Sequence, residues 1–197
     1  MKEKIITKAT DLFLKLGFKS ITMDDLATEM SISKKTIYKY FENKEVLVAE
    51  CTENSHKIFR GLMQEVANSS FNAIEENFEI RKIFKTIFSL GETSPLYQLR
   101  KYYPSIYEKV LEQENLEGVQ FMRNNLAKGI DQGYYRADID IEMTARLYFI
   151  LCFAINESIH LEKDSQQMEY GALEYHTRSI ATEKGILELE KQLNIHQ

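Results

Sequence analysis

The segment that decides the fold runs from Thr22 to Leu47 and reads TMDDLATEMSISKKTIYKYFENKEVL. It contains two short helical patterns that are separated by a turn of three residues. Thr22 is expected to cap the first helix, about 23–30, because Asp25 follows at the spacing of a short capping box. Ser33 is expected to cap the second helix, about 34–40. Two capped helices joined in this way predict a helix-turn-helix over about 23–42.

The outer face of the second helix carries the groups that bind DNA. The residues on this face are lysines, a hydroxyl and a phenol: Lys34, Lys35, Thr36, Lys39 and Tyr40. Lysines neutralise phosphates and release counterions, while hydroxyl and phenol groups fix the register on phosphate oxygens. A short helix can also enter the major groove, where its first residues reach base edges. The segment is therefore interpreted as a recognition helix for double-stranded DNA.

The distribution of charge along the chain supports this interpretation, whereas the net charge does not. The net charge of the chain is −5, which by itself argues against nucleic acid. Residues 1–50 hold nine lysines and eight acidic residues, whereas the remainder holds sixteen basic and twenty-two acidic residues. Between Ser31 and Lys44 there are four lysines and a single acid, Glu42. The positive charge is local and coincides with the predicted motif.

Composition favours an all-α fold. The chain has 197 residues with only 8 Gly and 2 Pro, so long helices with short connections are expected. Further helices are expected over about 2–16, 44–67, 71–90, 95–102, 105–133, 141–161 (capped by Asp140) and 166–182. This divides the chain into a three-helix helix-turn-helix head, 1–48, and a helical-bundle body for dimerisation and effector binding, 49–197.

The cysteines and the start of the chain predict a cytoplasmic, nucleoid-associated protein. Cys51 and Cys152 lie far apart and form no pair motif, which favours a reduced compartment. Met1 leads into charged residues rather than an apolar leader. The longest apolar run, 147–155, is nine residues, well short of the roughly 20 needed to span a bilayer. No membrane association is expected.

That apolar run also predicts a homodimer. Every residue from Leu147 to Ile155 is apolar, so a helix there must be covered on two sides. The amphipathic helix expected over 166–182 would complete a four-helix interface, and a two-fold dimer matches a palindromic operator. The expected interface residues are Tyr148, Leu151, Cys152, Ile155, Ile159, Ala172 and Tyr175.

At the level of individual residues, the first 50 positions resemble the DNA-binding head of the tetracycline-repressor (TetR) family. The combination of Tyr38, Phe41, Lys44 and Leu47 is specific to that head, and residues 128–140 resemble the family's linker between its seventh and eighth helices. Two positions depart from the family: Ser31 stands where Gly is frequent and Lys35 where a small residue is common. Phe41 corresponds to a core residue of the head. The DNA-binding residues expected from the pattern and the resemblance are Thr22, Ser33, Lys34, Lys35, Thr36, Tyr38, Lys39, Tyr40 and Lys44.

The resemblance further implies a repressor that releases a palindromic operator when a small hydrophobic or aromatic effector enters the body. In the family the effector tilts the helix that begins here at Lys44. Residues on the helices that surround the family's effector cavity are Phe59, Met63, Phe84, Phe88, Tyr103, Tyr107, Phe121, Met122 and Tyr148. The same residue types at helical spacing would also suit a plain core.

Two other functions remain as alternatives at this point. One is a TetR-like DNA binder that is controlled by a protein partner, and the other is a helical-bundle carrier or enzyme. Catalysis has no support, because no phosphate loop, nucleophile motif or metal spacing is present. The four histidines, His56, His160, His176 and His196, are interpreted as structural or exposed. The acidic pairs Glu75-Glu76 and Glu112–Glu114 are interpreted as solvated surface. No catalytic residue, cofactor or metal is expected.

Overall fold

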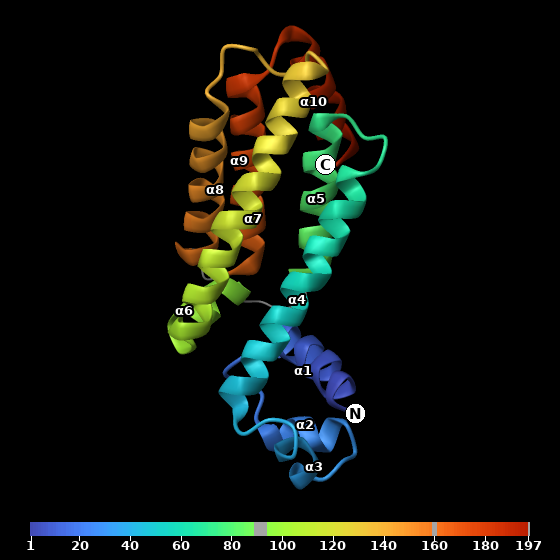
Figure 1. The fold of residues 1–197 in the computed structure, drawn as a ribbon, viewed down its shortest axis with the longest axis vertical. Helices are drawn as coiled ribbons and strands as arrows, with labels where there is room; N and C mark the ends of the chain where they lie inside the picture. Colours follow the sequence, from blue (N-terminus) through green and yellow to red (C-terminus); the bar gives the residue numbers. More distant parts are fainter. Residues whose placement is uncertain (89–93, 159–160, 197) are drawn as a thin grey trace.

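The computed structural model describes residues 1–88, 94–158 and 161–196, and these residues form ten α-helices and no strand. The all-α fold class predicted from composition is confirmed. A small group of helices, α1 (Lys2–Leu16), α2 (Met23–Glu29) and α3 (Lys34–Tyr38), lies at one end of an elongated molecule (Figure 1). The long helix α4 (Lys44–Ala67) leaves this head and runs alongside the body.

The helices of the head begin where local side-chain caps place them. The Thr22 hydroxyl accepts from the Asp25 backbone N–H at 3.1 Å, and the Asp25 carboxylate accepts from the Thr22 N–H at 2.8 Å. Asn43 caps α4 by accepting from the Val46 N–H at 2.9 Å. Gly17 ends α1 with φ 93°, and a Cβ there would lie 2.8 Å from the Gln98 side-chain oxygen. The capping predictions at Thr22 and Asn43 are confirmed.

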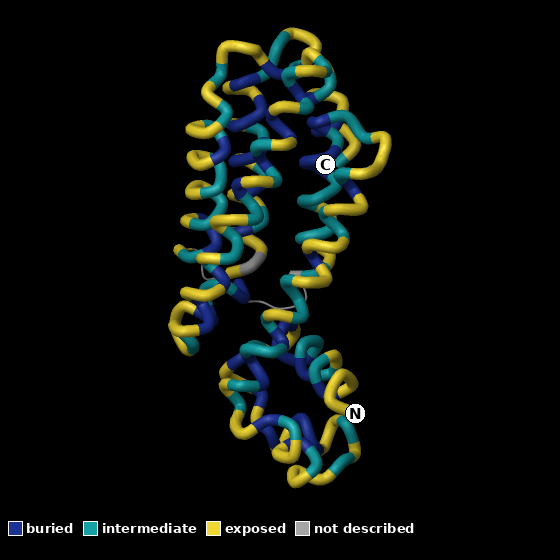
Figure 2. Tube along the Cα trace, viewed as in Figure 1, coloured by how far each residue is buried: buried dark blue, intermediate teal, exposed yellow. Residues whose placement is uncertain are grey.

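The core of the head continues into the body. Phe41, Ile37 and Leu47 are fully buried among the helices of the head. The same apolar cluster includes Leu99 and Ile106, which lie on α6 (Pro95–Tyr102) and α7 (Pro104–Asp131). Buried segments therefore run from the head through the start of α4 into the bundle (Figure 2). Burying this apolar surface fixes how the head sits on the body.

The body has a second core between α5 (Ala73–Phe88), α7, α8 (Ile141–Ser158), α9 (Glu162–Ile180) and α10 (Glu183–Ile195). The buried polar residues Glu76 and Asn125 in this part of the body are hydrogen-bonded to each other. The Asn125 amide donates to Glu76 at 2.9 Å, and the Lys128 ammonium donates to the other Glu76 oxygen at 2.5 Å. Glu76 is only 2% exposed, so the prediction that Glu75-Glu76 is solvated surface is wrong for Glu76. Charge pairing across α5 and α7 makes its burial tolerable.

Two features of the C-terminal part differ from the sequence prediction. A tenth helix follows α9 after the short connection at Ala181–Thr182, which has neither Gly nor Pro to mark a break. Thr182 starts this helix by accepting from the Gly185 N–H at 3.2 Å. Helix α9 begins at Glu162 rather than near 166. The predicted helix ends at 89–90 and 159–160 lie outside the described residues. No helix in the described part of the chain is long and apolar enough to cross a membrane.

The turn after α7 contains a close approach that only glycine permits. A Cβ at Gly129 would lie 2.0 Å from the Tyr135 ring, which is itself 1% exposed. Gly61, on the exposed side of α4, would place a Cβ in open space.

We predict opposite effects on stability at these two helical glycines. Gly129→Ala should lower the free energy of unfolding by about 1–3 kcal/mol because the Tyr135 ring must shift. Gly61→Ala should raise it by about 0.5–1 kcal/mol, since alanine restricts the unfolded chain. Urea unfolding followed by circular dichroism measures both, and equal effects at the two sites would contradict the packing described here.

Candidate DNA-binding surface and body cavity

Helix α3 is anchored on one side and exposed on the other. Ile37 is fully buried and packs α3 into the head core. The opposite side presents polar and charged groups at the tip of the molecule. Exposed there are Ser33, Lys34, Lys35, Tyr38 and Lys39, while Thr36 and Tyr40 are partly buried. Helix α3, which carries or adjoins these residues, lies at the end of the head away from the body (Figure 1).

Short-range hydrogen bonds hold this surface rigid. The Ser33 hydroxyl accepts from the Thr36 N–H at 3.1 Å, and the two hydroxyls lie 2.8 Å apart. The preceding turn contains Ser31 at φ 53°, a left-handed conformation that favours glycine. Hydrogen bonds from Thr22 lower the pKa of Asp25, so the capping carboxylate is ionised at neutral pH. These contacts fix where α3 begins relative to α2.

The lysines of α3 differ in how they are engaged. Lys34 forms an ion pair with Asp24 at 2.7 Å, lies over the Tyr38 ring at 5.8 Å, and has its pKa raised by the Asp24 carboxylate. Lys35 and Lys39 are exposed and form no ion pair within the described part of the chain. These two ammonium groups are the ones available to phosphates without breaking an existing contact.

Two predicted contact residues serve the head itself in this structure. The Lys44 ammonium donates to the Lys19 carbonyl at 3.1 Å and lies 5.9 Å from the Phe13 ring. Partial burial lowers the pKa of Lys44. Thr22 uses its side chain in the capping box of α2. Their contact with DNA stays a prediction. To bind DNA, each side chain would have to keep these bonds or exchange them for contacts with DNA.

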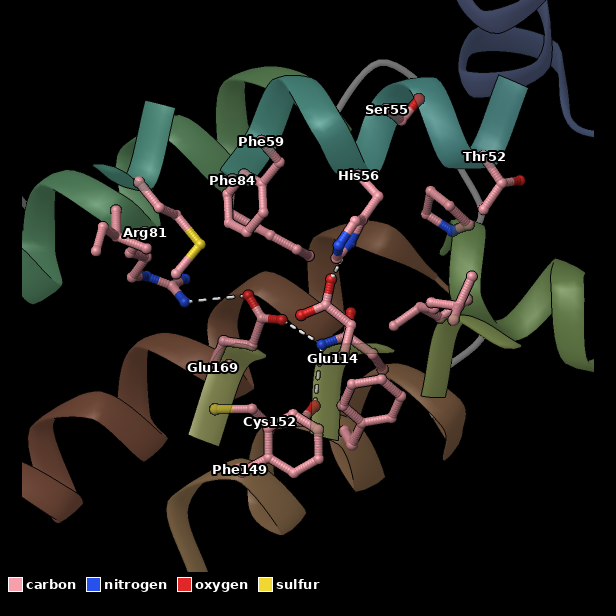
Figure 3. A pocket seen from close by; sticks show the side chains of 18 of the residues that line it. Thr52, Ser55, His56, Phe59, Arg81, Phe84, Glu114, Phe149, Cys152 and Glu169 are labelled. Atoms are coloured by element: carbon pink, nitrogen blue, oxygen red, sulfur yellow. Dashed lines mark hydrogen bonds and ion pairs between the residues drawn. The ribbon is translucent and has the colours of Figure 1, made fainter. Parts of the chain in front are cut away.

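The body encloses a cavity of about 260 Å³. It lies between α4, α5, α6, α7, α8 and α9, and Thr10, Leu14 and Phe18 of the head also line it. Figure 3 shows aromatic rings from α4, α5 and α8 around it. Six of the predicted pocket residues line this cavity: Phe59, Met63, Phe84, Phe121, Met122 and Tyr148.

Two tyrosines lie elsewhere than predicted. Tyr103 is in the turn between α6 and α7 and packs edge-on against Phe18 at 6.4 Å. Tyr107 is buried in the cluster that joins the head to the body. Neither lines the cavity, because both pack in the apolar cluster that joins the head to the body. The side chain of Phe88 lies outside the described residues.

The polar groups of the cavity were missed by sequence reasoning. His56 on α4 hydrogen-bonds Glu114 on α7 at 2.9 Å, and Arg81 on α5 pairs with Glu169 on α9 at 3.2 Å (Figure 3). The prediction that Glu112–Glu114 is solvated surface is wrong for Glu114, which lines the cavity. These partners lie 58 and 88 positions apart in sequence, and no motif connects them.

Both cysteines also line the cavity. They are free thiols, on α4 and α8. Burial raises the pKa of Cys51 and that of Cys152 to about 12. Each thiol is therefore protonated at neutral pH and behaves as part of the apolar wall.

The outer face of α8 and α9 is apolar, and it includes two of the predicted interface residues, Leu151 and Tyr175. Ile155 and Ala172 are buried within the subunit, at 6% and 7% exposure, so they cannot contact a partner. Tyr148 and Cys152 line the cavity. Ile159 lies outside the described residues. The exposed apolar residues of this face are Met143, Leu147, Ile150, Leu151, Met168 and Tyr175.

Comparisons with known proteins agree with this geometry. Residues 5–51 match the sequence profile of bacterial regulatory proteins of the tetR family. The chain is 27% identical over 165 residues to the uncharacterized HTH-type transcriptional regulator YhgD of Bacillus subtilis, covering 77% of this chain and 82% of YhgD. It is 26% identical over 175 residues to the biofilm operon icaADBC HTH-type negative transcriptional regulator IcaR of Staphylococcus aureus, covering 88% and 89%.

The likeness extends to the whole fold. A crystal structure of a transcriptional regulator from Cytophaga hutchinsonii superposes with a TM-score of 0.73 at 18% identity, covering 91% of this chain and 98% of that one. The capped helix-turn-helix, the basic outer face of α3 and these relatives define a DNA-binding regulator of transcription, not an enzyme. The DNA-binding head of the chain, residues 5–51, is that of the tetR family.

We predict that Lys35→Ala weakens binding to all DNA sequences and lowers the slope of log affinity against log salt by about 0.9, the value for one phosphate contact. Fluorescence anisotropy over a salt series measures this slope. Lys109→Ala, which removes an exposed lysine of α7, is the matched control and should leave the slope unchanged. An unchanged slope for Lys35→Ala would remove Lys35 from the phosphate contacts.

Proposed function

We propose that the protein is a cytoplasmic, nucleoid-associated repressor that binds a near-palindromic operator as a homodimer. It has a DNA-binding head, 1–48, and a body for dimerisation and effector binding, 49–197. The observation that carries the proposal is α3, whose buried Ile37 and capping Ser33 hold Lys35, Tyr38 and Lys39 outward. A repressive role is supported by the likeness to IcaR, which is named a negative regulator.

On the operator, α3 lies in the major groove and its flanking groups bind phosphates. Lys35 and Lys39 neutralise phosphate charge, and the Tyr38 phenol, 43% exposed, hydrogen-bonds a phosphate oxygen. The backbone N–H groups at the start of α4 add a positive dipole end. Two heads of one dimer contact half-sites about 34–36 Å apart.

The dimer forms through the outer face of α8 and α9. Leu147 and Ile150 are each about three-fifths exposed, and Tyr175 is 72% exposed. Exposing so many apolar side chains of two adjacent helices to water is unfavourable in free energy. Burying them against the same surface of a second copy suits a two-fold helical interface. The partner's α8 and α9 would cover it.

Effector binding in the cavity controls the spacing of the heads. Helix α4 contributes Thr52, Ser55, His56 and Phe59 to the cavity wall and begins at the DNA-binding surface. A ligand that binds better when α4 is displaced lowers the population of the DNA-bound arrangement, because only a difference in affinity shifts the equilibrium. The cavity supports a small molecule over a protein partner as the controlling ligand.

The operator test uses fragments of chromosomal DNA. Binding followed by sequencing should return an inverted repeat, and DNase I footprinting should protect both half-sites. Ser33→Ala, which removes the α3 cap, should weaken operator binding and cost about 1 kcal/mol of stability. Failure to enrich any repeat at low ionic strength would contradict the proposed function.

We predict that Leu147→Glu converts the dimer to monomer, because two carboxylates would be buried in a symmetric interface. Sedimentation velocity at micromolar concentration measures the oligomeric state. Leu116→Glu is the matched control, since Leu116 is 69% exposed on α7, away from this face. A Leu147→Glu protein that sediments as an intact dimer would exclude this face as the interface.

A further inference from the structure

The charges of the cavity indicate which class of molecule it binds, and this inference rests on the proposed function. Among the described residues, four ionisable groups other than thiols and phenols line it: His56, Arg81, Glu114 and Glu169. They form two separate pairs, and the Arg81–Glu169 pair lies to the left of the His56–Glu114 pair in Figure 3. The rest of the wall is mainly aromatic and aliphatic. Any charge on the cavity wall that these two pairs do not compensate decides the charge of the ligand.

The Arg81–Glu169 pair is complete without a ligand. One Glu169 oxygen pairs with Arg81 and the other accepts from the Asn156 amide. The Arg81 guanidinium also donates to the Gln166 carbonyl and stacks 5.3 Å from the Tyr170 ring. The positive and negative charges cancel, and both Glu169 oxygens and both terminal nitrogens of Arg81 have hydrogen-bond partners. This pair has no net charge to offer a ligand.

The His56–Glu114 pair is different, because its basic member is an imidazole. The His56 Nδ1 lies 2.9 Å from one Glu114 oxygen, and its Nε2 faces Glu117 at 3.3 Å. Neither a lysine nor an arginine forms an ion pair with Glu114 among the described residues. The neutral form of His56 therefore leaves a carboxylate that faces the cavity without a cation. The other Glu114 oxygen and the Phe149 ring both lie against Gly118, within 3.5 Å of where a Cβ would be.

We propose that the cavity binds an amphipathic cation, a protonated amine with an apolar body. The ammonium group pairs with Glu114 in place of His56, and the body lies among Phe59, Phe84 and Phe149. Aromatic faces also attract a cation through the ring quadrupole. An anionic ligand would instead meet two carboxylates and a guanidinium that is already paired.

This mode of binding acts directly on α4. The hydrogen bond between His56 and Glu114 connects α4 to α7 across the cavity. A second, exposed bond between the same helices runs from Arg60 to Glu117 at 2.9 Å. An ammonium group that takes Glu114 removes the inner bridge. Helix α4 is then held to α7 at this level by the exposed pair, which contributes little in water. The ligand's charge thereby loosens the helix that begins at the DNA-binding surface.

The test compares three probes that share one apolar body. 4-Phenylbutylamine is a cation at neutral pH, 4-phenylbutan-1-ol is its uncharged counterpart, and 4-phenylbutyrate is the anion. Isothermal titration of the full-length protein at pH 8 should give an amine affinity at least about tenfold above that of the alcohol. The anion should bind more weakly than the alcohol. Equal affinities for amine and alcohol, or tightest binding by the anion, would overturn the proposal.

Paired variants locate the site of the charge. Glu114→Gln should reduce the amine affinity about tenfold, to that of the alcohol, and leave the alcohol affinity unchanged. Glu117→Gln is the matched control, because Glu117 lies on the same helix and contacts His56 but does not line this cavity. It should keep the preference for the amine. A loss that occurs in Glu117→Gln but not in Glu114→Gln would place the ammonium group outside the cavity and overturn the assignment.

A pH series gives an independent readout that needs no Glu114 variant. The hydrogen bond to Glu114 raises the pKa of His56 above its usual 6.5, and the Glu114 and Glu117 charges add to this. Protonated His56 competes with the amine for Glu114, and the charged neighbours of this pair are Glu117 and Arg60. The amine affinity should therefore fall by at least about threefold as the pH falls from 8.5 to 6.5. His56→Gln keeps an amide donor but no titration, so the fall should disappear. A fall that persists in His56→Gln would contradict the competition.

Binding to DNA is measured separately. If 4-phenylbutylamine binds as described but the protein enriches no operator, the proposed function fails and the ligand class stands. If the operator is bound and the amine shows no preference over the alcohol, the ligand class fails and the proposed function stands.

Discussion

The apolar cluster that joins the head to the body constrains the rest of the molecule. Val48 and Cys51 at the start of α4 are buried in one cluster with Ile106, Tyr107 and Val110 of α7. Because protein interiors are close-packed, a rotation of α4 within this cluster has to be followed by the helices of the head. A hydrogen bond at 2.8 Å from the Phe18 N–H to the Gln98 side chain ties the end of α1 to α6 as well. The head and the cavity wall are thus mechanically one unit.

The features predicted from sequence are those fixed by neighbours within a few residues. The capping box of Thr22 and Asp25, the Ser33 cap and the Asp140 cap are all formed, at spacings of three residues. Periodic apolar residues placed nine of the ten helices to within a few positions. Local geometry determines such contacts, so one sequence is enough to see them. The recognition surface on α3 follows from the same local signals.

Features that depend on distant partners could not be predicted. Glu114 and Glu76 looked like solvated acids because their partners, His56 and Asn125, lie 58 and 49 positions away. The apolar stretch of α8 indicated that two sides are covered, but not which residues face inward. Ile155 turned out to face the subunit's own core and Leu151 the outside. Rotation of a helix that is apolar all round is set by packing, and packing is not local.

Burial of the two thiols in the cavity wall limits their chemical reactivity. A thiolate is the species that attacks disulfides, electrophiles and peroxides, and a pKa of about 12 leaves very little of it at neutral pH. Cys51 and Cys152 are therefore slow to oxidise or alkylate, despite lying beside a ligand cavity. Their side chains therefore contribute apolar surface to the cavity and little nucleophilic reactivity.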